Sequence, residues 1–333
     1  MHVTDCGRRG LAWAVAAGLV LLAAAPVAAQ TTSASVFGQV KDSQGGVLPG
    51  ATATLTSKTQ ANTLTATADA EGRFVFPIVR PDNYTLKVSM QGFKTLERTT
   101  VQVNANDRFF AGILTLEVGA ITEEVSVTGR VSELQATSGE RSYTMESEVI
   151  KNIANNGRSL FNFATLVPGV ATRYNDQRST GQVSDLIVNG QRPNSNNMTI
   201  DGVTNIDTGD NGGNMAQTNI DAVAEFKILT NAYQAEYGRA VGGQVQVVTK
   251  SGTQSFHGSG YWYGRRSDWQ ANTWTNKRAA APPPVGSGKE IQLPEASRND
   301  YGYTLGGPIY IPGVFNEDRK HLFFFWSQEF QRR

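Results

Sequence analysis

The chain is poor in the residues that build disulfides and metal centres. Its 333 residues include one cysteine and three histidines. The cysteine, Cys6, lies in an N-terminal segment that we expect to be removed, so the mature chain would have no disulfide and no cysteine metal site. Neither His257 nor His321 begins an H-x-x-E or H-E-x-x-H motif. Because the sequence offers no nucleophile–base pair and no metal cluster, we expect no enzyme activity and no cofactor.

An excess of charge of one sign is also absent. The chain has 30 Lys and Arg against 29 Asp and Glu, a formal net charge of +1. Residues 1–29 contain Asp5, Arg8 and Arg9, so removing them brings the charge to zero. A neutral chain gives no electrostatic reason to expect nucleic acid as a partner.

Long apolar runs are missing after the N-terminus. The only such run, Leu11–Ala25, follows Arg8 and Arg9 and precedes Ala28 and Ala29. This arrangement is typical of a secretory signal, with cleavage predicted between Ala29 and Gln30. The alternative is a retained anchor, although the run is short for a membrane span. Without a further apolar run, the 34 glycines favour β-rich, turn-rich structure over a helical membrane protein.

Residues 30–118 alternate as short strands separated by turns. Apolar or small residues recur at every second position, and segments rich in Gly, Pro and Asp separate the runs. This pattern predicts an antiparallel β-sandwich, for which we expect seven strands. The residues that share strand faces are Val36, Gly38, Val40, Ala51, Ala53, Leu55, Phe74, Phe76, Ile78, Tyr84, Leu86 and Val88.

This region resembles a carboxypeptidase regulatory-like domain. The matching motifs are Gly38–Asp42, Leu48–Ala51, Gly72–Phe76 and Tyr84–Val88, the last leading to Gly92-Phe93. The resemblance implies a sandwich fold and no peptidase activity, because zinc hydrolysis needs His and acidic ligands that this chain lacks.

Residues 119–137 form a predicted coupling segment. Within it, Ile121–Arg130 resembles the TonB box, the stretch that outer-membrane receptors present to the inner-membrane TonB protein. The candidate TonB contacts are Glu124, Val125, Ser126 and Val127, with Ser126 interrupting the usual valines. An extended β-branched segment can add as a strand to a partner's sheet. The alternatives are the last strand of the sandwich or a plain linker.

Residues 138–251 are predicted to mix helices and strands. Apolar spacing predicts helices over Ser147–Ile153 and Ser159–Val167, the second ending at Pro168-Gly169. The other predicted elements are a hairpin of Asp185–Gly190 with Asn197–Gly202, a short helix at Ile220–Ala224, and strands at Glu225–Thr230 and Gly243–Lys250.

This region resembles the plug domain of TonB-dependent receptors, and the variant Ala235–Arg239 behind a sandwich resembles the Oar-like branch. Five motifs occur in the family's order: Asn156–Ser159, Leu166–Val170, Val188–Arg192, Ile200–Val203 and Glu236–Ala240 with Gly242–Val245. The resemblance implies that Arg192 and Arg239 face acidic residues of a surrounding barrel. The alternative is that both are ordinary arginines beside turns.

A Gly-rich loop in this region gathers oxygen-bearing side chains: Asp201, Asn205, Asp207, Asp210, Asn211 and Asn214. Such loops can bind calcium, but the spacing does not fit the EF-hand pattern. A ligand-facing apical loop and a solvated polar loop remain the alternatives.

Residues 252–333 contain three predicted strands, Ser255–Gly264, Asp300–Gly306 and Lys320–Gln331. Their aromatic residues, and a long polar connection followed by a short one, are typical of an outer-membrane barrel. A plugged transporter has about 22 strands, so we expect an incomplete transmembrane antiparallel barrel and an N-terminal fragment.

The predicted fold is mainly β, with a sandwich, an α+β plug and the first barrel strands. The resemblance implies a TonB-dependent receptor or transporter in the Gram-negative outer membrane, with its sandwich in the periplasm. It would move a bulky extracellular solute, with TonB and outer-membrane lipid as partners. The alternative is a soluble periplasmic module that binds carbohydrate or protein, or mediates adhesion.

Overall fold

The structure is a computed structural model of the chain. It describes residues 32–60, 62–119, 124–127, 139–153, 155, 157–172, 183–209, 212–231, 237–238, 240–266, 269, 271 and 297–332. The predicted cleavage site, Ala29 and Gln30, lies outside these residues, as does most of the connection after Arg265. No helix in the described part of the chain is long and apolar enough to cross a bilayer.

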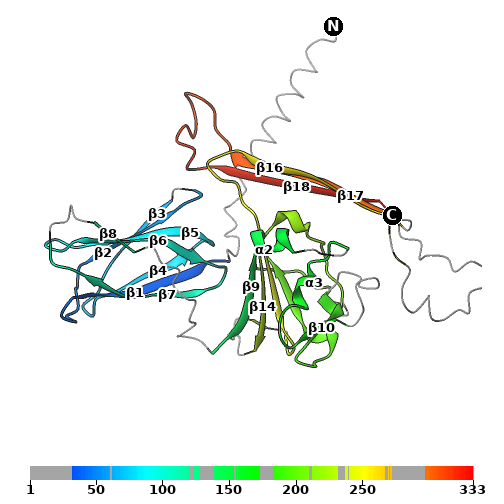
Figure 1. Ribbon diagram of the computed structural model, residues 1–333, viewed down its shortest axis with the longest axis horizontal. Coiled ribbons are helices and arrows are strands. Elements are labelled where there is room, and N and C mark those ends of the chain that lie inside the picture. Colours follow the sequence, from blue (N-terminus) through cyan, green and yellow to red (C-terminus); the bar gives the residue numbers. More distant parts are fainter. Residues whose placement is uncertain are drawn as a thin grey trace, which may run out of the picture. The chain divides into compact units, whose positions relative to one another are not determined.

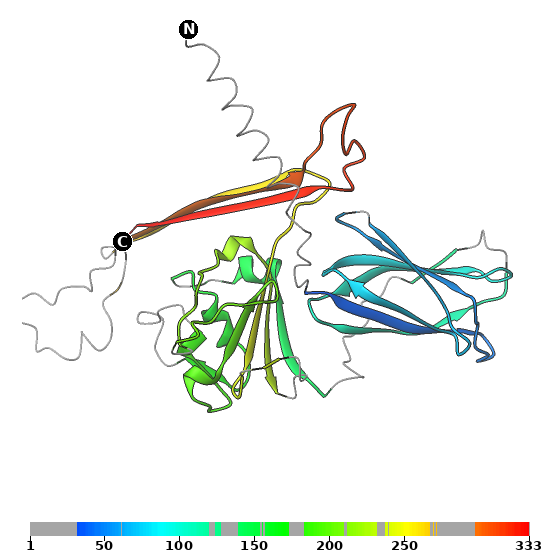
Figure 2. The ribbon, with the colours of Figure 1, turned by 180° about the vertical axis from the view of Figure 1, so that it is seen from behind.

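The N-terminal region is a β-sandwich of two sheets (Figure 1; Figure 2 shows it from behind). One sheet has the order β4-β1-β7 and the other β3-β2-β5-β6-β8. The strands are β1 (Ala34–Asp42), β2 (Thr52–Ser57), β3 (Thr63–Thr67), β4 (Arg73–Val79), β5 (Asp82–Ser89), β6 (Thr95–Val103), β7 (Arg108–Leu116) and β8 (Glu124–Val127). The sandwich contains the seven predicted strands and, in addition, an eighth strand, β8. Pairing is antiparallel except for β1 with β7 and β6 with β8.

Alternation places the predicted side chains inside the sandwich, with one exception. Val36, Val40 and Leu55 are fully buried, as period-two burial predicts. The prediction that Ile78 lies in the core is wrong, because Ile78 is 67% exposed while Val79 is buried. The register of β4 against β1 shifts between the pairs Val36↔Phe76 and Ala34↔Val79. This bulge adds one residue, which reverses the alternation after Phe76.

The predicted plug region, residues 138–251, is built on a five-stranded sheet of order β13-β12-β15-β14-β9. Its strands are β9 (Arg141–Glu146), β12 (Asn197–Ile200), β13 (Val203–Thr204), β14 (Val223–Asn231) and β15 (Gln244–Thr249); β10 (Val170–Thr172) and β11 (Leu186–Val188) form a separate pair. The helices are α2 (Ser147–Asn152), α3 (Phe161–Ala164) and three 3-10 turns, η1 (Val183–Asp185), η2 (Pro193–Ser195) and η3 (Ile220–Ala222).

Three sequence predictions for this region need correction. The short helix predicted over Ile220–Ala224 is the 3-10 turn η3, and Val223 and Ala224 already belong to β14. The predicted hairpin does not form, because β11 pairs with β10 while β12 pairs with β13 and β15. Between β11 and β12 the chain makes the turn η2, where the buried Asn196 side chain donates to the Leu186 carbonyl. The helix predicted over Ser159–Val167 is only the four residues of α3.

The plug sheet has one apolar and one polar face. Phe226 and Ile228 of β14 and Val245 of β15 belong to the core cluster shared with Phe161 and Phe163 of α3. On the opposite face, alternation places Glu225, Lys227, Gln244 and Gln246, which are also buried. A buried polar sheet face is unusual, since charged side chains are rarely buried without partners.

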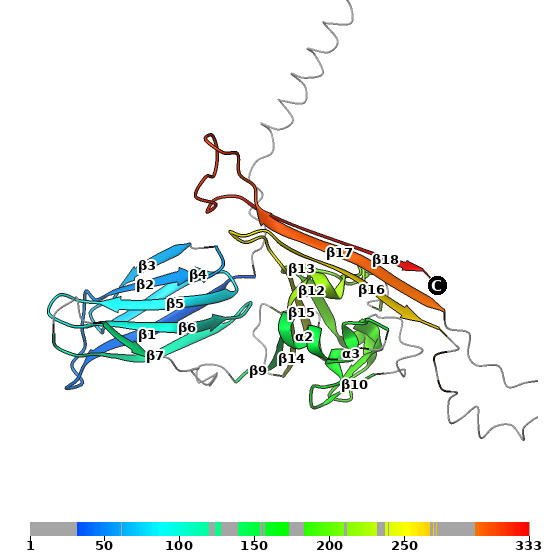
Figure 3. The ribbon, with the colours of Figure 1, turned by 45° about the horizontal axis from the view of Figure 1, so that its top comes forward.

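The last region is a three-stranded antiparallel sheet of β16 (His257–Arg265), β17 (Arg298–Pro308) and β18 (Phe323–Arg332), labelled in Figure 3. All three predicted strands are present. The pairs Trp262↔Tyr301 and Tyr301↔Phe330 lie on one face, with Trp262 60% exposed. The opposite face carries Tyr261, Asp300, Thr304, Ser327 and Glu329. This face also carries the aromatic Tyr263 and Phe325, but it holds the carboxylates Asp300 and Glu329. Barrel strands typically have an apolar side toward lipid and a polar side toward the interior.

Candidate functional site

Arg158 occupies a tight turn between α2 and α3. Its φ is 51° and that of the preceding Gly157 is 80°, so two successive residues have left-handed backbone conformations. That conformation is uncommon for a residue with a side chain and persists only where surrounding contacts hold it. The Arg158 side chain is only 9% exposed, and Leu160 and Phe161, two and three residues later, are buried in the core. The turn therefore fixes the position of the Arg158 guanidinium.

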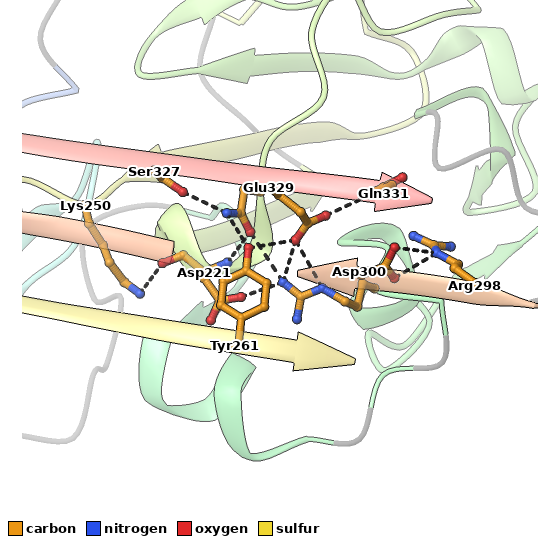
Figure 4. A network of polar contacts seen from close by, with 10 residues as sticks. Asp221, Lys250, Tyr261, Arg298, Asp300, Ser327, Glu329 and Gln331 are labelled. Atoms are coloured by element: carbon orange, nitrogen blue, oxygen red, sulfur yellow. Dashed lines mark hydrogen bonds and ion pairs between the residues drawn. The ribbon is translucent and has the colours of Figure 1, made fainter. Parts of the chain in front are cut away.

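The Arg158 guanidinium bonds two carboxylates (Figure 4). One is Asp221 of η3, with Nη2 2.5 Å from Oδ2. The other is Glu329 of β18, whose Oε2 accepts from Nη2 at 2.8 Å and from Nε at 3.2 Å. All three side chains are largely buried. Because Arg158 and Asp221 belong to the plug region and Glu329 to β18, this cluster links the plug region to the three-stranded sheet. Hydrogen bonds between ionised partners are stronger than those between neutral partners.

Neutral side chains complete the cluster. The Tyr261 hydroxyl of β16 donates to Glu329 Oε2 at 2.9 Å. Asn219 donates through Nδ2 to the Tyr261 hydroxyl and to Ser327 Oγ, both at 2.7 Å. A Cβ at Gly302 of β17 would collide with the Tyr261 hydroxyl, so glycine makes room for that ring. Three strands of the last sheet thus contribute to the contact.

The faces of two aromatic rings also contact the guanidinium. Arg158 Cζ lies 4.6 Å from the Tyr261 ring centroid and 4.5 Å from that of Tyr263. Both distances are within the range of cation–π attraction, which is strongest at desolvated sites. The two rings come from successive odd positions of β16, which alternation places on the same face.

Opposing effects act on the charges of this cluster. Burial alone would lower the pKa of Arg158, but the hydrogen bonds to Asp221 and Glu329 raise it above its ordinary value, so the guanidinium stays charged. Lys250 donates to the Asp221 carbonyl at 2.6 Å. Burial and the nearby Lys151 lower the Lys250 pKa to about 8, against the attraction of Asp221. Arg298 pairs with Asp300 on β17 at 2.8 Å (Figure 4).

A second buried polar cluster involves the polar face of the plug sheet. Glu225 Oε2 accepts from the Ala105 backbone N–H at 2.9 Å. Lys227 Nζ donates to Asp107 Oδ1 at 2.7 Å and lies 3.7 Å from Glu140. Burial raises the Glu225 pKa to about 7, although the Ala105 hydrogen bond and Lys227 oppose the shift. The turn between β6 and β7 thus supplies partners to β14.

The two arginines predicted to face the barrel are not among these contacts. Arg192 is exposed at the start of η2 and makes no ion pair within the described residues. Arg239 lies outside the described residues. Their role stays a prediction. Sequence reasoning missed Arg158, although it belongs to the motif Asn156–Ser159; an arginine after glycine and just before an apolar helix was the available signal.

The candidate TonB contacts form a strand. Glu124, Val125, Ser126 and Val127 make up β8, which pairs in parallel with Thr95–Arg98 of β6. The backbone pairing matches the alternative prediction that this segment is the last strand of the sandwich. Such pairing is compatible with a second strand on the other edge of β8.

The oxygen-rich loop uses several of its side chains within the fold. Asp201 accepts from the Thr249 backbone N–H and hydroxyl, both at 2.8 Å. Asn205 exchanges hydrogen bonds with the backbone of Ala216. Asp210 and Asn211 lie outside the described residues, and among those described no group of three His, Cys, Asp or Glu could hold a metal.

Comparison with known families matches three consecutive parts of the chain. Residues 35–111 match the carboxypeptidase regulatory-like domain, residues 135–244 the TonB-dependent receptor plug domain, and residues 248–333 an outer membrane beta barrel domain. The TonB-dependent transporter Oar of Myxococcus xanthus is 31% identical over 307 residues, which are 89% of this chain and 27% of that protein. The chain therefore spans about a quarter of that relative's length.

Solved structures include similar receptors. The siderophore receptor PirA of Acinetobacter baumannii is 20% identical, with a TM-score of 0.35 over 50% of this chain and 22% of that one. A mutant of the ferric enterobactin receptor of Pseudomonas aeruginosa, in complex with enterobactin, is 18% identical, with a TM-score of 0.38 over 57% and 24%.

The predicted family is therefore confirmed by the three matched domains and their order, and by the similarity to the Myxococcus xanthus transporter. The chain belongs to the TonB-dependent receptors of the Gram-negative outer membrane.

Proposed function

We propose that this chain serves the energised passage of a bulky solute across the outer membrane. The observation that supports this function best is the Arg158 cluster, which ties the plug region to β16 and β18. When this polar contact opens, water can form hydrogen bonds with the separated groups. Opening an apolar contact would instead expose apolar surface to water, which costs free energy. A plug held in this way can be displaced and can return.

TonB is the proposed energy-coupling partner. No enzyme activity is part of the proposal, because the matched plug domain belongs to receptors and the similar Myxococcus xanthus protein is a transporter. The proposed organisation is a signal peptide over 1–29, a sandwich over 30–118, a coupling segment over 119–137, a plug over 138–251 and barrel strands over 252–333. The sandwich would then lie in the periplasm. A soluble periplasmic module is disfavoured because residues 248–333 match a membrane barrel domain.

The coupling role of β8 is tested by Val125→Pro in a receptor that joins this chain to a complete barrel. Proline removes a backbone donor and disfavours strand pairing. We expect capture of the TonB periplasmic domain and energised uptake to fall at least tenfold, while solute binding at the cell surface is unchanged. The solute used is one identified by a binding screen.

Val118→Pro is the matched control. Val118 is 73% exposed, and the backbone bonds at its bridge to Phe93 are made by Glu117 and Gly119. Uptake should therefore survive that change. Unchanged uptake in the Val125 variant would show that coupling lies elsewhere in the chain.

A further inference from the structure

β8 forms one end of the larger sandwich sheet. The sheet order is β3-β2-β5-β6-β8, and the pairs run from Thr95↔Glu124 to Arg98↔Val127. β6 therefore covers one edge of β8. Within the described parts of the chain, no strand pairs with its other edge. An open strand edge offers unpaired N–H and C=O groups that can template another strand.

The chain before β8 is fastened to the sandwich. The Lys94 N–H donates to the Glu117 carbonyl at 2.8 Å, and the Gly119 N–H donates to the Gly92 carbonyl at 3.2 Å. Lys94 and Glu117 also form an ion pair at 3.5 Å. These contacts surround the antiparallel bridge between Phe93 and Val118. The backbone of Glu117–Gly119 is thus hydrogen-bonded to the sandwich.

Pairing with β6 leaves half of the backbone groups of β8 available. In a strand, backbone groups of successive residues point to opposite edges, so one neighbour uses one set only. A partner that adds a strand meets a segment that is already extended. It avoids the conformational entropy cost of ordering a free segment, which normally reduces affinity.

We infer that the sandwich presents β8 as a preformed edge strand, and that TonB binds by adding a strand to the open edge while β6 stays paired on the other. This inference rests on the proposed function, in which TonB is the partner of Glu124–Val127. It assigns the regulatory-like domain a role as a docking platform. The competing arrangement is strand exchange, in which TonB removes β8 from β6.

Hydrogen exchange on the unaltered chain separates these arrangements. The full chain in detergent is compared with and without the TonB periplasmic domain. Strand addition predicts that amides of Glu124–Val127 gain protection while those of Thr95–Arg98 keep theirs. Loss of protection at Thr95–Arg98 on binding would overturn the inference and leave the proposed function standing. No binding by the unaltered chain would overturn both.

A disulfide staple gives the second test. Since the mature chain is expected to lack cysteine, Glu97→Cys with Ser126→Cys, at register partners of β6 and β8, can form a unique bond. Lys87→Cys with Glu97→Cys, partners on β5 and β6, is the matched control. TonB affinity is measured for each variant before and after reduction.

Strand addition predicts that the oxidised Glu97/Ser126 variant binds TonB at least as tightly as its reduced form, as does the control pair. A tenfold or greater loss confined to the oxidised Glu97/Ser126 variant would establish strand exchange instead. Failure of that disulfide to form, while the control disulfide forms, would overturn the pairing of β8 with β6.

Discussion

The sandwich and the plug region bury very different side chains. The sandwich core consists of apolar residues contributed by its own two sheets. Its buried polar residues are few: Ser57, Thr95 and Asn104. The plug region adds to its apolar core a larger polar set: Asp185, Asn196, Asn197, Asn205, Glu225, Lys227, Thr230, Gln244 and Gln246. The sandwich is thus stabilised mainly from within, whereas the plug region depends on polar partners.

Hydrogen-bond satisfaction shows the same contrast. Among the described residues, buried side-chain atoms without a protein partner include one in the sandwich, Arg98 Nε. The plug region contributes Ser159 Oγ, Glu225 Oε1, both polar atoms of Gln244, and Gln246 Nε2. Buried polar groups in native proteins nearly always have partners, including water. The polar face of the plug sheet is therefore suited to contact with further polar groups.

The largest predicted effect breaks the Arg158 cluster. Arg158→Met keeps much of the side-chain volume but leaves Asp221 and Glu329 as buried, uncompensated carboxylates. Breaking a buried ion pair on one side costs about 3–5 kcal/mol, so the free energy of unfolding should fall by that amount. Chemical denaturation of the full chain in detergent measures it.

Arg73→Met is the matched control on the sandwich. Arg73 pairs with Asp69 and Glu71 but is 61% exposed, and exposed pairs contribute about 0–1 kcal/mol. Equal losses for the two variants would remove the contrast between the regions.

The second prediction concerns pH. The folded-state pKa of Glu225 is about 7, above the ordinary value of 4.5, so the folded chain binds this proton more tightly than the unfolded chain. The Glu225 contribution to stability is therefore fully present below pH 4.5 and is lost as pH rises toward 7. The slope is at most about 1.4 kcal/mol per pH unit.

Glu225→Gln should flatten that slope, measured by denaturation at a series of pH values. The exposed sandwich residue Glu71, changed to Gln, should leave it unaltered. A slope that persists in Glu225→Gln would show that Glu225 is not the group responsible for it.

The smallest predicted effect has the opposite sign. Gln244 is fully buried and neither polar atom of its side chain has a partner. Leucine at this position removes that desolvation cost, so Gln244→Leu should stabilise the chain by about 1 kcal/mol. In the sandwich, Gln39 donates to the Glu71 carbonyl at 2.8 Å, so Gln39→Leu should not stabilise. If Gln244→Leu destabilises instead, a water or partner group already satisfies the amide.

Local patterns were sufficient to predict most strands. Alternation at Val36, Leu55 and Leu86 reflects a backbone geometry that sends successive side chains to opposite faces, so burial follows directly from the sequence. The same rule failed at Ile78 because a bulge depends on pairing with β1, which the β4 sequence does not contain. The hairpin expected between residues 185 and 202 failed for a similar reason, since β12 takes β15 as its partner.

The sequence by itself determined the order of the regions and the period of their strands. Only the tertiary structure decided which arginine joins the plug region to the barrel strands. It also showed that β8 lies on the sandwich. Arg158 and Glu329 are 171 positions apart, and β8 meets β6 in a parallel pair. The local sequence pattern predicts which side chains of a segment are buried or exposed, because that depends on the segment's own geometry. Contacts between residues far apart in the sequence depend on how separate elements pack together.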